Sequence, residues 1–159
     1  MHAAASQAHS GAIKVLGRHG ADVNIADDTG CTPFDLVMGK PRPQAVLALD
    51  ALFAAGLEIN RATHSPLFQA LDHDELMECL LVHGLDPNVQ QNGETVLFRA
   101  AVSGSSKSVI ESLLKYGADA TMQCGPRRLT ALDVATAKNH QHVIRVLKVP
   151  LRVLCTLPL

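Results

Sequence analysis

The stretch that decides the fold runs from Ser10 to Phe34 and reads SGAIKVLGRHGADVNIADDTGCTPF. Its first part predicts a helix, one face of which carries the apolar residues Ala12, Ile13, Val15 and Leu16. Gly20 ends this helix, because glycine adopts the left-handed conformation of a helix end at the lowest cost. A turn follows at residues 28–30. Thr32 and Pro33 then begin a second helix, with threonine as the N-cap and proline at the first helical position.

The segment GADVN at residues 20–24 returns along the chain in related forms, each after an apolar helix. These are GLEIN at 56–60, GLDPN at 84–88 and GADAT at 117–121. The last residues of successive segments are separated by 36, 28 and 33 positions. A period of about 33 residues is that of ankyrin repeats, and the chain resembles the ankyrin-repeat family.

This resemblance implies an all-α fold, an ankyrin-repeat solenoid of helix-turn-helix units with short β-hairpin fingers. We expect one ankyrin-repeat domain over residues 1–148, followed by an atypical apolar tail at 149–159. The expected repeats cover about 1–26, 27–62, 63–90, 91–123 and 124–148. Residues 1–5 are similar to the middle of the family's first helix, so we expect the chain to be a fragment or a variant start of a longer protein.

Two repeats depart from the family pattern. Residues 39–43 contain one glycine and two prolines, which predict a reshaped loop before a helix at about 44–55. Only residues 61–64 separate Asn60 from the next helix start, which predicts a shortened or absent finger. In the fourth repeat, Asn92-Gly93 is a strong signal for a tight hairpin turn.

Stacked repeats share a continuous apolar core, because one helix pair cannot bury its apolar face alone. One leucine in each repeat is expected to be buried and to stabilise the fold by roughly 2 kcal/mol. These are Leu16, Leu52, Leu80, Leu113 and Leu147. Asn24, Asn60 and Asn88 resemble the family's loop asparagine, which ties one loop to the next. Thr121 interrupts that row.

Composition excludes several classes of protein. Apolar residues make up 47% of the 159-residue chain and aromatic residues only 3%, which favours small helices packed on one another. The net charge of −1 indicates neither a nucleic-acid partner nor an anionic membrane. The N-terminus has no long apolar run, so we expect no signal peptide and no membrane span. Location in the cytoplasm or nucleus is therefore predicted.

We predict no enzymatic activity, no cofactor and no metal site. The sequence contains no phosphate-binding glycine loop, nucleophile elbow or kinase signature. The cysteines form no CxxC pair that would suggest zinc. His2, His9 and His140 stand where the ankyrin family itself uses histidine, so a structural role is expected for them. A metal site built from His64, His73, Asp72 and Asp74 is the weaker alternative, because no helical ligand pair supports it.

The resemblance implies a protein-binding module that acts as an adaptor or scaffold through its concave surface. Its partners are unidentified proteins, and we expect a monomer. Family members contact partners through finger tips and exposed first-helix positions. The predicted finger residues are Asp27, Asp28, Thr29, Gln90, Gln91, Asn92, Met122, Gln123, Arg127 and Arg128. The predicted helix positions are Lys40, Asp72, His73 and Lys138.

The tail suggests an alternative function. Residues 150–159 are similar in spacing to the start of a SOCS box, in which Leu151 and Cys155 would share a helix face and enter an elongin pocket. The chain would then be a substrate-recognition subunit of a ubiquitin ligase. Pro158 and the missing second half of the box argue for the other interpretation, a chance match in a variant apolar terminus.

Two loop asparagines are candidates for modification. Asn24 and Asn60 each follow a leucine by eight residues, as at ankyrin sites hydroxylated by the oxygen-sensing asparaginyl hydroxylase, which uses iron and 2-oxoglutarate. Asn88 keeps the spacing but follows the rigid Pro87. The alternative is that all three asparagines only brace the loops.

Overall fold

The computed structural model describes residues 1–40, 42–58 and 66–148. The chain divides into two compact units, Met1–Arg61 and Ala62–Leu159. Both are built from short helices joined in pairs, and the helical fold predicted from the repeats is confirmed. The division of residues 1–148 into five repeats stays a prediction.

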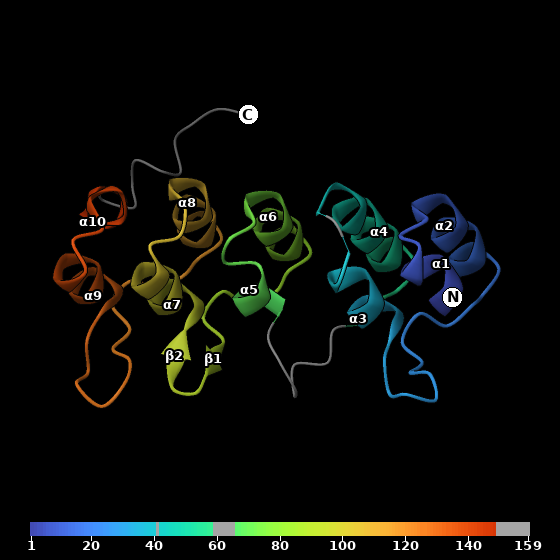
Figure 1. Ribbon diagram of the computed structural model, residues 1–159, viewed down its shortest axis with the longest axis horizontal. Helices are drawn as coiled ribbons and strands as arrows, with labels where there is room; N and C mark the ends of the chain where they lie inside the picture. Colours follow the sequence, from blue (N-terminus) through green and yellow to red (C-terminus); the bar gives the residue numbers. More distant parts are fainter. Residues whose placement is uncertain (41, 59–65, 149–159) are drawn as a thin grey trace. The chain divides into compact units, whose positions relative to one another are not determined.

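The first unit contains helices α1 (His2–Ser6), α2 (Ser10–Arg18), α3 (Pro33–Met38) and α4 (Arg42–Ala54). Helix α1 packs against α3, and α2 packs against α4 (Figure 1). The first helices of the two pairs therefore form one layer and the second helices form another. Gly17 permits the close approach of the second layer, because a Cβ atom at this position would lie only 2.5 Å from Ala55 Cβ.

A capping box begins α3 where the sequence predicted a helix start. The Thr32 hydroxyl accepts a hydrogen bond from the Asp35 N–H at 3.3 Å, and Asp35 Oδ2 accepts one from the Thr32 N–H at 2.8 Å. Pro33 occupies the first helical position, where its missing N–H costs nothing. Asp35 stands where the family has histidine, and its carboxylate completes the cap.

The second unit contains helices in two rows. Helices α5 (Pro66–Gln69), α7 (Val96–Ser103) and α9 (Ala131–Ala137) form one row. Helices α6 (Asp74–Val82), α8 (Lys107–Lys115) and α10 (Gln141–Lys148) form the other. The strands β1 (Gln90–Gln91) and β2 (Glu94–Thr95) precede α7 and project beyond its row (Figure 1).

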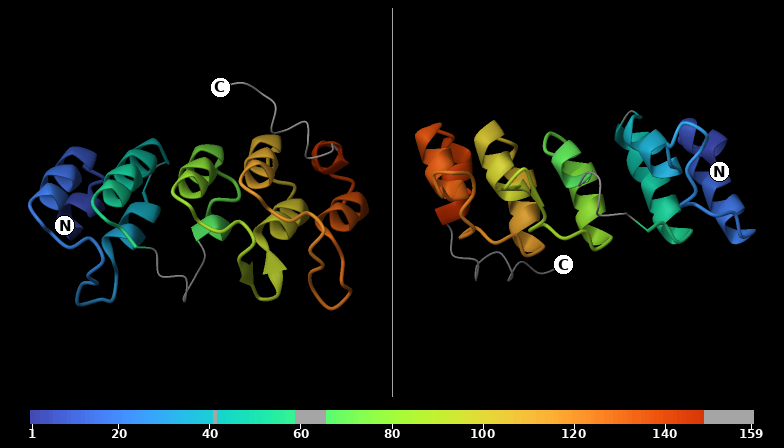
Figure 2. Two further views of the ribbon diagram at one scale, coloured as in Figure 1. Left: turned by 180° about the vertical axis from the view of Figure 1, so that it is seen from behind. Right: turned by 90° about the horizontal axis from the view of Figure 1, so that it is seen from below.

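Asn92 and Gly93 make the predicted tight turn between the two strands. Both residues have positive φ angles, 54° and 75°, which the favoured two-residue hairpin turn requires. The antiparallel register pairs Gln90 with Thr95 and Gln91 with Glu94. The hairpin and the loop that precedes α9 extend from the same side of the α5–α7–α9 row (Figure 2).

Most of the predicted core is confirmed. Leu52, Leu80 and Leu113 are fully buried, and Leu147 is half-buried. The prediction that Leu16 and its neighbours form a buried face is wrong. Helix α2 packs against α1 and α4, and these contacts bury Ile13 while leaving Leu16 36% exposed and Val15 53% exposed.

Two further predictions concern the chain before and after α4. The loop expected at residues 39–43 is shorter than predicted, because α4 already begins at Arg42 and includes Pro43. Proline is tolerated in a first helical turn, since the N–H groups there have no partner within the helix. The shortened finger at residues 61–64 lies outside the described residues, as does the tail at 149–159.

The turns between paired helices share one backbone requirement. Ala8, Gly104 and Asn139 occupy corresponding places and have φ angles of 51°, 71° and 60°. Such angles suit glycine and are tolerated by asparagine, whereas alanine is strained by them. Ala8 therefore stores strain at the position where the family prefers glycine.

Candidate partner-binding surface

Asn24 braces the loops of the first unit. Its Nδ2 donates a hydrogen bond to the Gly56 carbonyl at 3.2 Å, and its Oδ1 accepts one from the Glu58 N–H at 2.9 Å. The Asp22 carboxylate accepts a hydrogen bond from the Asn24 N–H at 2.7 Å and fixes the asparagine in its own loop. The amide therefore fixes the loop after α2 to the loop after α4.

Asn88 does the same in the second unit. Its Nδ2 donates to the Gly117 carbonyl at 2.9 Å, and its Oδ1 accepts from the Asp119 N–H at 2.7 Å. Thr121 stands at the corresponding place one repeat later and bonds within its own loop, to Asp119 Oδ1. The Thr121 hydroxyl and then its backbone N–H lower the pKa of the Asp119 carboxyl.

The histidines that were predicted to be structural include two that bond backbone across repeats. His2 Nε2 lies 3.1 Å from the Cys31 carbonyl oxygen, next to the first finger. His140 Nδ1 lies 3.0 Å from the Ala101 carbonyl oxygen, and its ring packs so closely on Gly104 that a Cβ there would lie 2.8 Å away. His142 Nε2 also lies 3.0 Å from a backbone carbonyl oxygen, which the sequence did not predict.

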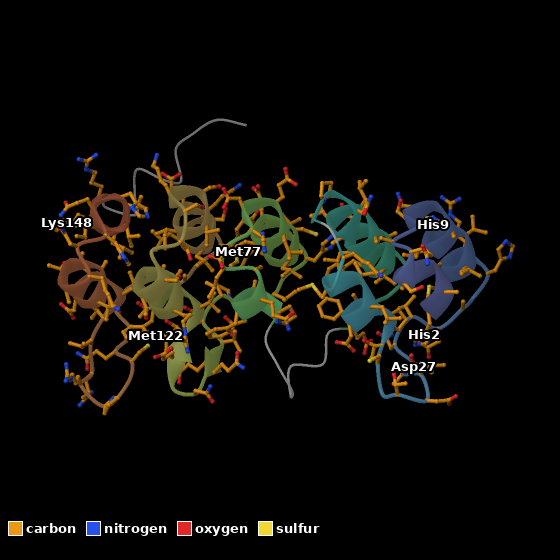
Figure 3. The ribbon with its side chains drawn as sticks, in the orientation of Figure 1. His2, His9, Asp27, Met77, Met122 and Lys148 are labelled. Atoms are coloured by element: carbon orange, nitrogen blue, oxygen red, sulfur yellow. The ribbon has the colours of Figure 1, made fainter. Side chains whose placement is uncertain are left out.

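The first finger is a turn held by Asp27. Its Oδ1 accepts hydrogen bonds from the Thr29 N–H at 2.9 Å and the Cys31 N–H at 3.1 Å, and from the Thr29 hydroxyl. The Thr29 hydroxyl and then the Cys31 N–H lower the pKa of the Asp27 carboxyl. Figure 3 shows His2 beside the finger that carries Asp27. Asp28 is exposed at its tip.

The second finger is the β1–β2 hairpin. Gln90 and Asn92 are exposed, and Gln91 is half-buried. At its base, Arg99 Nε lies 2.9 Å from Glu94 Oε2, and this ion pair joins β2 to α7. The hairpin therefore offers amide groups at its tip and one oriented cation at its base.

The last finger, residues 122–129, is anchored to the hairpin. The Gly125 N–H donates a hydrogen bond to the Gly93 carbonyl at 3.3 Å, and the Thr95 N–H lies 3.5 Å from Cys124 Sγ. Cys124 is buried with Phe98 of α7, and Leu129 packs against this cluster.

Arg127 and Arg128 are both exposed on the last finger, and Arg128 adopts a positive φ angle of 51°. Gln123 is exposed and Met122 is half-buried (Figure 3).

The predicted helix positions lie at the helix ends. Lys40 follows α3 and is half-buried. Asp72 and His73 lie between α5 and α6, where Asp72 is exposed and His73 is the N-cap of α6. Lys138 caps the C-terminus of α9 and is exposed. Each of these side chains has part of its surface open to solvent.

The metal alternative is not tested as a whole, because His64 lies outside the described residues. One of its members has another contact, since the Asp74 carboxylate accepts a hydrogen bond from the Ser106 hydroxyl, the N-cap of α8. Asn60, Leu151 and Cys155 also lie outside the described residues, so the predictions made for them stay predictions.

Sequence reasoning missed a cavity in the second unit. A cavity of about 320 Å³ lies between the end of α5, the hairpin and the side of α7. Its lining residues are Phe68, Leu71, Gln91, Asn92 and Arg99. Gln91 and Asn92 were predicted as partner-binding residues, whereas Phe68, Leu71 and Arg99 were not. Phe68 is half-buried, and its place in the lining could not be read from a repeat alignment.

The family model for ankyrin repeats in three copies matches residues 42–124 and 67–150. The chain belongs to the ankyrin-repeat family. This ankyrin-repeat chain is also similar to FPV031 of fowlpox virus (strain NVSL), which is named as an ankyrin repeat protein, with 27% identity over 147 residues. The match covers 85% of the chain and 42% of the relative, so the chain spans less than half the length of that protein.

Membership of the ankyrin-repeat family indicates a protein–protein interaction module. Proteins of this family are typically not enzymes. Among the described residues of the ankyrin-repeat chain, no helix has the length and apolar character needed to cross a membrane.

Proposed function

We propose that the chain is an adaptor or scaffold that binds partner proteins through its fingers and exposed first-helix ends. One observation carries this proposal: polar, solvent-exposed side chains are displayed on loops that hydrogen bonds and, in the last finger, a buried cysteine hold in place. In the second unit, Cys124 and the Gly125–Gly93 hydrogen bond fix the last finger against the hairpin. A fixed surface loses little conformational entropy on binding, and so favours recognition.

The proposed contact residues in the first unit are Asp27, Asp28, Thr29 and Lys40. Those in the second unit are Gln90, Gln91, Asn92, Met122, Gln123, Arg127, Arg128, Asp72, His73 and Lys138. Only a few of them are expected to carry most of the binding energy. The partners are proteins, and we propose a monomer that acts in the cytoplasm or nucleus without a nucleic-acid or membrane ligand.

The test is affinity capture with the wild-type chain and with a variant that carries Arg127→Glu and Arg128→Glu. Both arginines are exposed, so the variant should keep the wild-type melting temperature. We expect at least one protein to bind the wild type directly, after purification, and to associate more slowly with the variant. Arg145→Glu, an exposed charge reversal on α10, serves as the control. If every captured protein binds the wild type and the finger variant equally, the last finger is not part of the site.

The ubiquitin-ligase alternative rests on the spacing of Leu151 and Cys155 alone. Its test is the binding of purified elongin to the wild-type chain and to a Leu151→Ala, Cys155→Ala variant. Loss of elongin binding in the variant would favour the alternative, whereas absence of binding by the wild type would leave the adaptor proposal alone.

Hydroxylation of Asn24 is a second proposal for the loops. The enzyme would transfer one oxygen atom of O₂ to the asparagine β-carbon while 2-oxoglutarate is oxidised to succinate and CO₂. Access to the β-carbon requires the loop to open, which breaks the bonds from Asn24 to Gly56 and Glu58. The corresponding bonds of Asn88 are shorter, and Pro87 before it is buried. Asn24 is therefore the better candidate, while the bracing role remains the alternative.

A further inference from the structure

The cavity of the second unit is open to solvent, and its lining combines apolar and polar side chains. Phe68 and Leu71, at the end of α5, supply the apolar surface, and Phe68 remains half-buried. Gln91, Asn92 and Arg99 supply amide and guanidinium groups from the hairpin and α7. Ligand sites usually combine apolar surface with a few convergent polar groups, and this lining contains both kinds. Its volume of about 320 Å³ is at the small end of the range for such sites, so it suits one large side chain.

Arg99 is held in place on one side and available on the other. Its Nε lies 2.9 Å from Glu94 Oε2 as an ion pair, and that buried oxygen accepts no hydrogen bond. The Arg99 side chain is nevertheless 45% exposed. Guanidinium has five N–H donors in a planar fork, so pairing at Nε leaves the terminal nitrogens able to bind a carboxylate. Glu94 therefore holds the cation by charge and leaves its terminal donors available.

The finger next to the cavity carries two exposed arginines. The Gly125–Gly93 hydrogen bond brings the last finger, with Arg127 and Arg128, next to the hairpin that forms one wall. The acidic groups on these elements include Glu94, which is paired with Arg99, Asp72, which is exposed after Leu71, and Asp133, which caps α9 after the last finger. The last finger therefore adds positive charge beside the cavity, which favours an acidic partner.

We propose that this cavity binds an acidic peptide segment of a partner protein, with one large apolar side chain against Phe68 and Leu71 and a neighbouring carboxylate on Arg99. The proposal rests on the function proposed above and names the chemistry of the partner. Apolar burial would supply affinity, and the carboxylate would supply orientation and a faster association.

The experiment selects short random displayed peptides on the full chain and measures the affinity of the enriched peptides by fluorescence polarisation. We expect enriched sequences to combine Leu, Phe or Trp with adjacent Asp or Glu. Arg99→Glu should weaken their binding about tenfold or more, because it places like charges together. A peptide with Lys in place of its acidic residue should recover affinity for Arg99→Glu. Arg145→Glu on α10 is the matched control and should change affinity less than about twofold.

Phe68→Leu tests the apolar part of the cavity lining while keeping an apolar side chain. The melting temperature of this variant shows whether the fold is kept. Enriched peptides that lack acidic residues, or that bind Arg99→Glu as well as they bind the wild type, would overturn the proposal. Failure to enrich any peptide would also overturn it. In either case the capture experiment with the Arg127 and Arg128 variant decides separately whether the chain binds proteins elsewhere.

Discussion

Replacement of Gly17 by alanine should loosen the contact between α2 and α4. A Cβ atom at Gly17 would lie 2.5 Å from Ala55 Cβ and 3.4 Å from Ala55 Cα. Carbon atoms in contact prefer a separation of about 3.5–4.0 Å, so the two segments must move apart by roughly 1 Å. Neither Cβ atom can rotate away, because its position is fixed by the backbone.

The magnitude follows from two opposing effects. Overpacking of a close contact costs about 1–3 kcal/mol, and the upper end applies where backbone must shift. Alanine recovers about 1 kcal/mol of helix propensity relative to glycine. Gly17→Ala should therefore destabilise the first unit by about 2 kcal/mol. Gly11→Ala is the matched control in the same helix, since no atom lies within 4 Å of its added Cβ. It should stabilise by about 0.5 kcal/mol.

The assay is chemical denaturation followed by circular dichroism, with hydrogen exchange of α2 and α4 as a local measure. Ala55→Gly in the Gly17→Ala background removes the clashing carbon, so the double variant should regain most of the lost stability. The argument would be refuted if Gly17→Ala were as stable as Gly11→Ala. Additivity of the Gly17 and Ala55 changes within about 0.5 kcal/mol would also refute it, because contacting residues are expected to couple.

Three further predictions follow from particular residues. Leu80→Ala should lower the free energy of unfolding by about 2–5 kcal/mol in a denaturation experiment, because Leu80 is fully buried. Val82→Ala, at a 59% exposed position, should lower it by less than about 0.5 kcal/mol. The hydroxyl and then the N–H of Thr130, the N-cap of α9, lower the pKa of Asp133. The Asp133 carboxylate therefore stabilises the fold above about pH 4, and this stabilisation is lost as the pH falls through the folded-state pKa. Asp133→Asn should therefore lower the melting temperature at neutral pH, and its difference from the wild type should shrink in acid; a difference that does not change with pH would contradict this. On incubation with the asparaginyl hydroxylase, peptide mass spectrometry should detect added oxygen on Asn24 before Asn88. The idea fails if Asn24 stays unmodified while a known ankyrin substrate reacts in the same tube.

Much of the fold could be predicted because its signals are local. The helix start at Thr32 and the hairpin turn at Asn92-Gly93 depend on the conformational preferences of a few adjacent residues. The recurrence of GADVN-like segments then identified equivalent positions in distant parts of the chain, and this step required no knowledge of contacts. The finger residues could be predicted for the same reason, because a repeat alignment matches each position of one repeat with a position of the next.

The sequence by itself determined the repeat, the helix pairs and the loop asparagines, because each reflects a local or periodic preference. The tertiary structure decided which apolar residues are covered and which polar groups meet. Leu16 has the same place in the pattern as Leu80, yet it is 36% exposed because the contacts of α2 do not cover it. Phe68 and Arg99 form a cavity only because α5, the hairpin and α7 lie together. Burial is a property of neighbours in space, and those neighbours are set by packing between repeats.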